Sequence, residues 1–186
     1  MTTIDPRPIA LVGLRASGKT TLGKLLAEKL GRVFVDLDEE VSREDAALRG
    51  TDVLRAAGEI LSVEGEPKFR DLEERALERV LSRTEPLVLA TGGGVVERAK
   101  NRLLLRTRAR CLWLQVPVEE LQRRLRADPT VRPALLGTDP VAEVPTIAAR
   151  RGPWFRELRA SMLAGALEPE EWVERSLSVL ALDPIH

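Results

Sequence analysis

The sequence of 186 residues is 44% hydrophobic, and its 29 basic and 29 acidic side chains leave no formal net charge. This length favours a single domain over residues 1–186, and the charge balance argues against a general nucleic-acid binder. No apolar run approaches the roughly 20 residues that span a bilayer, and the start, MTTIDPRP, lacks the pattern of a signal peptide. A lone cysteine, Cys111, fits a cytoplasmic location, and with His186 as the only histidine we expect no histidine-based catalysis.

Short apolar runs alternate with helical patterns along the chain. Continuous apolar runs bounded by turns are typical of parallel strands that are buried on both faces. The predicted strands occupy residues 9–12, 33–35, 86–90, 111–116 and 161–167. The predicted helices end at Gly31, cover residues 69–81, follow Pro117 and close the chain over 169–180, with loops over 42–58 and 127–146. The alternation predicts an α/β fold with a five-stranded parallel sheet flanked by helices.

Residues 13–20, GLRASGKT, follow the first predicted strand and match the phosphate-loop pattern G-x-x-x-x-G-K-[ST]. The backbone N–H groups of such a loop and the helix start behind it bind phosphate oxygens. Lys19 can reach the β- and γ-phosphates, and the Thr20 hydroxyl can ligate Mg²⁺. The residues expected to contact ATP here are Arg15, Ala16, Ser17, Gly18, Lys19, Thr20 and Thr21. The alternative is an ordinary glycine-containing turn between a strand and a helix.

Two carboxylates follow the second predicted strand, in the string FVDLDEE. Asp36 and Asp38 alternate, so one can face a metal ion and the other an acceptor hydroxyl. Both lie beyond the carboxyl end of a strand, where open α/β sheets bind their ligands. An acidic turn that caps the next helix explains the same residues equally well.

Further candidates come later in the chain. In EGEPKFRDLEE, Arg70 can point away from the core face of its helix into a cleft, where Glu73, three residues later, can hold its guanidinium in place. The alternative is a surface salt bridge between the two residues, which is more common for such a pair. Three glycines, Gly92, Gly93 and Gly94, permit a close backbone approach to a ligand, although a flexible turn is the alternative. Arg132 lies in a long loop that could close as a mobile lid, and Arg151 is expected in a turn before Pro153.

The order of these strings resembles the shikimate kinases over residues 9 to 160. The strings that carry the resemblance are GLRASGKTTLG, DLD, GEPKFRDLE, GGGVV, TVRPALLG and RRGPWFREL. The resemblance implies the fold of the small P-loop kinases, with a lid over residues 127–146 and a helical substrate-binding region over 39–72. It also implies ATP-dependent phosphorylation of the 3-hydroxyl of shikimate, on the route to chorismate and the aromatic amino acids. ATP is then the co-substrate, Mg²⁺ the cofactor and shikimate the partner, and we expect a cytoplasmic monomer that engages neither nucleic acid nor membrane.

The resemblance also implies a role for each candidate. Lys19 and Thr20 match the phosphate-binding lysine and the Mg²⁺-ligating hydroxyl, and Asp36 matches a carboxylate that helps to hold Mg²⁺. Asp38 matches the carboxylate that binds the shikimate hydroxyls and can accept the proton. The residues implied to bind shikimate are Asp38, Arg70, Gly92, Gly93, Gly94 and Arg151, and those implied to act in catalysis are Lys19, Asp38 and Arg132, the last through the ATP phosphates.

Some features of the resemblance stay open. DAALRGTDV, residues 45–53, is an expected insertion, and either Arg124 or Arg126 could lie near the adenine. A kinase for another acidic polyol, such as gluconate, is one rival. A sensor module that binds a ligand without turnover is another, although we expect such a module to lose catalytic groups that are present here.

Overall fold

The structure, a computed structural model, describes residues 5–128, 137 and 139–182. Its five strands form one parallel sheet in the order β2-β3-β1-β4-β5. The strands are β1 (Ile9–Val12), β2 (Val33–Asp36), β3 (Leu87–Ala90), β4 (Arg110–Gln115) and β5 (Ser161–Ala164). The predicted parallel sheet is confirmed, and so is the fifth strand, which is shorter than the run that predicted it.

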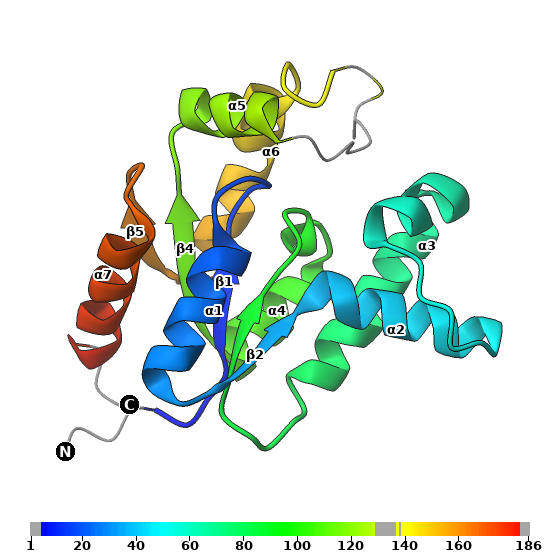
Figure 1. The fold of residues 1–186 in the computed structure, drawn as a ribbon, viewed down its shortest axis with the longest axis horizontal. Helices are drawn as coiled ribbons and strands as arrows, with labels where there is room; N and C mark the ends of the chain where they lie inside the picture. The colour runs from blue at the N-terminus through cyan, green and yellow to red at the C-terminus, as the bar shows by residue number, and fades with distance from the viewer. Residues whose placement is uncertain (1–4, 129–136, 138, 183–186) are drawn as a thin grey trace.

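Helices cover both faces of the sheet (Figure 1). Successive residues of β1 point to opposite faces, so Ala10 and Val12 belong to one apolar cluster while Ile9 and Leu11 belong to another. The first cluster packs mainly under α2 (Leu37–Arg49), α3 (Ala57–Val80), α4 (Ala99–Arg108) and α6 (Val144–Glu157). The second packs mainly under α1 (Lys19–Leu30), α5 (Val118–Ala127) and α7 (Pro169–Leu182). A short 3₁₀ helix, η1 (Val95–Glu97), precedes α4.

The predicted loop over residues 42–58 is wrong for most of its length. α2 continues to Arg49 and α3 begins at Ala57, so only a short connection separates them. Asp36 caps the start of α2 through its side chain, and Gly50 ends the helix in a left-handed conformation. Ala46 is buried on the face of α2 that packs against the core, so part of the supposed insertion is a regular helix.

α3 consists of two helical halves joined at Gly65, whose φ of 80° and ψ of 165° interrupt the helix. Only glycine adopts such a backbone without strain. Pro67 then lies in the first turn of the second half, where a missing N–H leaves no helical hydrogen bond unmade. Ile60 is the buried apolar residue of the first half of α3, whereas the second half buries Phe69, Leu72, Ala76, Leu77 and Val80 in the core.

α6 replaces the turn that the sequence predicted around Arg151. The helix runs through Pro153, and Gly152 precedes this proline. A side chain before proline disfavours helical geometry, and glycine removes most of that clash, so the helix continues. α4 was not predicted either, because its sequence, AKNRLLLRTR, buries few of its residues. Arg151 therefore lies on a rigid element rather than in a loop.

The expected lid over residues 127–146 is described only at its ends. α5 reaches Ala127 and α6 begins at Val144, so both ends are helical. Residues 129–136 and 138 lie outside the described residues, and Arg132 is among them. Within the part of the chain that the structure describes, no helix has both the length and the apolar character to cross a bilayer.

Candidate active site

One cleft of about 1050 Å³ gathers almost all the predicted site residues at the carboxyl ends of β1, β2 and β3. Those that line it are Arg15, Ala16, Gly18, Lys19, Thr20, Thr21, Asp36, Asp38, Arg70, Gly92, Gly93, Gly94 and Arg151. Ser17 is buried beneath the loop instead, where its hydroxyl meets Lys19. Arg132 lies outside the described residues. Five separate segments of the sequence thus meet at the sheet edge where parallel α/β folds bind ligands.

The loop over residues 13–20 curls around the ammonium group of Lys19. Lys19 Nζ donates to the carbonyl oxygens of Gly13 at 3.0 Å and Leu14 at 2.7 Å, and to Ser17 Oγ at 3.2 Å. Lys19 is 8% exposed and is the first residue of α1. Its positive charge and the positive end of the helix dipole therefore face the same part of the cleft, which favours a polyanion there.

Asp36 joins the nucleotide loop to the start of α2. Its Oδ2 accepts a hydrogen bond from Thr20 Oγ1 at 3.0 Å, and its Oδ1 accepts one from the backbone N–H of Asp38 at 3.0 Å. Asp36 therefore caps α2 and also contacts the loop. The helix cap and the carboxylate beside the loop, which the sequence analysis gave as alternatives, are both present in this one residue. A hydroxyl and a carboxylate at this separation are two oxygen ligands of the kind that Mg²⁺ takes alongside phosphate oxygens.

Arg70 and Glu73 form a buried pair, and the surface salt bridge considered from the sequence is wrong. Arg70 is 7% exposed and Glu73 is 1% exposed, and Arg70 Nη1 donates to Glu73 Oε2 at 2.8 Å. Burial raises the pKa of Glu73, although the charge of Arg70 opposes that rise. Burial would lower the pKa of Arg70, but the charge and hydrogen bond of Glu73 outweigh it and the pKa is raised. Among the described residues, Arg70 Nε and Glu73 Oε1 are buried and have no hydrogen-bond partner.

Each glycine of the triple-glycine turn faces a different neighbour that leaves no room for a side chain. A Cβ on Gly92 would lie 3.0 Å from Glu73 Oε1, and a Cβ on Gly93 would lie 2.9 Å from the backbone N of Arg15. A Cβ on Gly94 would lie 2.6 Å from Cζ of Arg70. The turn is therefore the surface on which the nucleotide loop and the buried arginine both rest, and the flexible-turn alternative does not describe it.

We predict that Gly94→Ala displaces Arg70 and weakens binding of the ligand that Arg70 faces roughly tenfold, because overpacking of a closed site forces a shift that costs about 1–3 kcal/mol. Binding at the loop over residues 13–20 should stay within about twofold, since Gly94 faces Arg70 and that loop faces Gly93. Steady-state rates with each substrate varied in turn measure both values. An unchanged KM on the Arg70 side would mean that Arg70 does not need its present position.

Arg151 enters the cleft from α6 and is held by a residue that the sequence analysis missed. Its Nη1 donates to the carbonyl oxygen of Gly93 at 3.0 Å, and its Nε and Nη2 donate to Glu97 Oε1 at 2.8 and 2.5 Å. Arg151 is 3% exposed, and burial lowers its pKa while the carboxylate of Glu97 opposes the change. The position of Glu97 three residues after Gly94 was the only signal that could have identified it.

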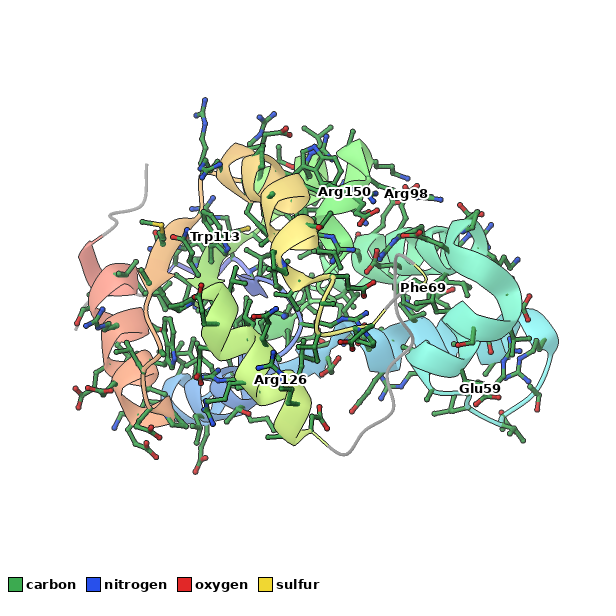
Figure 2. All side chains as sticks on the ribbon, turned by 90° about the horizontal axis from the view of Figure 1, so that it is seen from above. Glu59, Phe69, Arg98, Trp113, Arg126 and Arg150 are labelled. Carbon is green, nitrogen blue, oxygen red and sulfur yellow. The ribbon has the colours of Figure 1, made fainter. Side chains whose placement is uncertain are left out.

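Arg124, rather than Arg126, lies on the cleft. Its Nη1 donates to the carbonyl oxygen of Ala16 at 3.4 Å, and its Nε donates to Glu120 Oε1 at 2.6 Å. Arg126 is exposed on α5 and does not line the cleft (Figure 2). Asp128, which follows α5, also lines the cleft and was not predicted.

The first half of α3 forms a further wall of the cleft that the sequence analysis assigned partly to a loop. The residues of this wall are Ala56, Ala57, Gly58, Glu59, Leu61 and Ser62. Figure 2 shows Glu59 on this half and Phe69, another residue of the cleft, on the second half. The kink at Gly65 is what brings both halves to one cavity.

Comparisons with known proteins agree with this geometry. A family model described as "Shikimate kinase" matches residues 15–181. A curated shikimate kinase from Caldicellulosiruptor bescii is 36% identical over 171 residues, which cover 92% of this chain and 94% of that protein. The solved shikimate kinase from Acinetobacter baumannii in complex with shikimate superposes with a TM-score of 0.78 at 32% identity and covers 95% of this chain and 94% of its own. That from Bacteroides thetaiotaomicron gives a TM-score of 0.78 at 30% identity, over 94% of this chain and 98% of its own.

Proposed function

The chain belongs to the shikimate kinase family, and from that premise we propose how its side chains divide the reaction. The reaction is ATP-dependent phosphorylation of the 3-hydroxyl of shikimate, in the biosynthesis of chorismate and the aromatic amino acids. The observation that carries the assignment of roles is that Arg70 and Arg151, both buried, lie against adjacent glycines of one turn. That turn packs on the nucleotide loop through Gly93 and Arg15, so the two substrates would meet there.

The nucleotide side of the cleft is the loop over residues 13–20. Lys19 would exchange its contacts with loop carbonyls for the β- and γ-phosphate oxygens, as the lysine of such loops does. Backbone N–H groups of the loop and the start of α1 would bind the remaining oxygens. Arg132 keeps its proposed role on the phosphates from the lid, and we add Arg124, which already contacts the carbonyl of Ala16.

Mg²⁺ would be held by Thr20 and Asp36, whose side-chain oxygens are 3.0 Å apart. Among the described residues, no group of three or more acidic, histidine or cysteine side chains gathers to hold a metal ion. This suits Mg²⁺, which commonly binds kinases through one or two protein ligands together with substrate phosphates. When bound, the ion neutralises charge on the phosphates and orients them for transfer.

The acceptor side is formed by the two arginines, Asp38 and the triple-glycine turn. Arg70 and Arg151 would bind the shikimate carboxylate, because guanidinium forks match carboxylates in a buried site. Asp38 lines the same cleft, close to Gly92 and across from Arg70. It would orient the hydroxyls and accept the proton that leaves the 3-hydroxyl. Since the transition state of phosphoryl transfer is loose, orientation is the larger of these two contributions.

We predict that Asp38→Asn lowers turnover roughly a hundredfold, with shikimate binding also weakened, because general base and orienting groups contribute about 10²–10⁴-fold. ATP binding should survive, since Asp38 is not a partner of Thr20. ADP release measured with shikimate, with gluconate and without acceptor reads out turnover and specificity, and calorimetry reads out ATP binding. Loss of ATP binding would show that the roles of Asp36 and Asp38 are interchanged.

The remaining proposals concern the setting of the enzyme. The chain would act as a single-domain monomer in the cytoplasm, with ATP and shikimate as its partners and without nucleic acid or membrane. Residues 127–146 would close over the nucleotide, and residues 39–72 would form the helical side of the acceptor pocket. The formal net charge of zero, which lacks the basic excess of a general nucleic-acid binder, supports the absence of nucleic acid.

A further inference from the structure

The junction between η1 and α6 is built around one carboxylate, that of Glu97. Its side chain is 12% exposed and comes from the last residue of η1, directly beyond the triple-glycine turn. Oε1 accepts two hydrogen bonds from Arg151, and Oε2 accepts one from Arg150 Nη2 at 2.9 Å. Figure 2 shows Arg150 on the same side of the molecule as Arg98, the residue that follows η1. Glu97 therefore binds two consecutive residues of α6.

The contacts of Arg151 leave one particular edge of its guanidinium available. A guanidinium has five N–H groups. Among described residues, Glu97 receives the N–H of Nε and one from Nη2, and the carbonyl of Gly93 receives one from Nη1. One N–H on each terminal nitrogen remains, and the terminal N–H groups of a guanidinium are donors that can bind a carboxylate in two-pronged fashion. Glu97 thus determines which edge of Arg151 faces the cleft.

The charges of the site point the same way. Arg70 and Arg151 are both buried, and their positive charges repel each other. The charge of Arg70 accordingly lowers the pKa of Arg151. Glu73 is the partner of Arg70, and Glu97 is the partner of Arg151. The charge of Glu97 also helps to raise the pKa of Arg70. The two arginines therefore each have a carboxylate of their own before any substrate enters.

We propose that Glu97 is a positioning residue for the acceptor, which fixes Arg151 so that its free edge meets the carboxylate of shikimate. The proposal rests on the function proposed for Arg151. Glu97 would not contact the substrate. It would act through Arg151 and, because it follows Gly94 by three residues, would keep Arg151 in register with the carbonyl of Gly93. A rival reading is that Glu97 competes with the substrate carboxylate for Arg151, and it predicts the opposite change in affinity.

The test is steady-state kinetics of the full chain carrying Glu97→Gln or Glu97→Ala, with shikimate and ATP varied in turn. We expect the shikimate KM to rise roughly tenfold, as for the loss of one hydrogen bond to a charged group, with kcat within about threefold and the ATP KM unchanged. The matched control is Glu157→Gln, which breaks a different ion pair of α6, that between Arg102 Nε on α4 and Glu157 Oε2 at 2.6 Å. It should leave the shikimate KM within about twofold.

Arg151→Met, alone and combined with Glu97→Gln, separates this inference from the function on which it rests. If Glu97 acts through Arg151, Glu97→Gln adds less than about twofold to the shikimate KM in the Arg151→Met background. A raised KM in Arg151→Met with an unchanged or lowered KM in both Glu97 variants would overturn the role of Glu97 alone. An unchanged KM in Arg151→Met would overturn the role of Arg151 and this inference with it. Should Glu97→Ala fail to fold, Glu97→Gln keeps an acceptor oxygen and decides the question.

Discussion

Replacing Lys19 by methionine is expected to lower kcat about a thousandfold, at the upper end of what one charged group provides in phosphoryl and acyl transfer. The physical reason is the position of the charge. Lys19 Nζ is enclosed by two loop carbonyls and Ser17 Oγ at 2.7 to 3.2 Å, so its ammonium lies inside the loop that must hold the phosphates. Methionine has a similar length and apolar stem, so the variant removes charge and hydrogen bonding and little else.

Lys24→Met is the matched control for this variant. Lys24 lies on the same helix, α1, is exposed, has its ammonium 5.9 Å from the ring centroid of Phe34, and is not among the residues that line the cleft. Its replacement should leave kcat within about twofold, as for most surface changes. ADP release at saturating shikimate and ATP compares the two variants. If Lys19→Met keeps a tenth of the activity, the loop binds nucleotide without contributing its lysine to the transfer.

Features that depend on local sequence were predictable here. The phosphate loop is a contiguous string whose strand and helix are adjacent to it, and Arg70 and Glu73 are three residues apart on one helix. The sheet was predictable from runs of four apolar residues. A parallel strand that is buried on both faces has apolar residues at successive positions, without the apolar–polar alternation of a half-exposed strand. The burial of the Arg70–Glu73 pair depends on the triple-glycine turn that packs against it. That contact joins segments far apart in the chain, so the sequence did not predict it.

Features that depend on how elements dock were not predictable. Arg124 and Arg126 flank Leu125, one of the two buried residues of α5. Their spacing says that they lie on opposite borders of the apolar face, but only the packing of α5 decides which border meets the nucleotide loop. Glu97 and Arg151 are 54 residues apart in the chain, and neither sits in a string that requires the other.

The error over residues 42–58 has a different cause. The insertion was expected because the segment between Asp38 and Arg70 is longer than the family pattern, and the stretch is also rich in charged residues. In the structure, Asp45 of α2 pairs with Arg49 of the same helix and with Arg55 of the connection, and Arg55 also pairs with Glu64 of α3. Asp45 itself is 4% exposed, and its pKa is lowered chiefly by the hydrogen bond from Arg55. A charged sequence can therefore be a packed helix when each charge meets a partner from the neighbouring element.

The second large effect is expected from Arg70→Met, which should destabilise the fold as well as abolish tight binding of shikimate. Arg70 is the hydrogen-bonding partner of a carboxylate that is 1% exposed. Removing one member of such a buried pair leaves an uncompensated charge, which costs about 3–5 kcal/mol. We expect the lower end of that range, because Arg151 also acts electrostatically on Glu73 and remains in place. Urea unfolding at pH 7.5 measures the loss.

The loss should depend on pH in a definite direction. Burial already raises the pKa of Glu73, and without Arg70 the main opposing charge is gone. A carboxyl with a raised pKa in the folded state holds its proton more tightly there, so stability falls as the pH rises above the ordinary value of 4.5. The destabilisation of Arg70→Met relative to the unaltered protein should therefore shrink as the pH is lowered from 7.5 toward that value.

Adding Glu73→Gln to Arg70→Met separates stability from binding. Glutamine has the shape of the carboxylate without its charge, so the double variant should regain most of the free energy of unfolding and lose its pH dependence. It should still bind shikimate poorly, because the guanidinium is absent. Recovery of binding in the double variant would contradict the role of Arg70, since the weak binding of Arg70→Met would then come from the unpaired charge of Glu73 and not from a missing contact with the substrate.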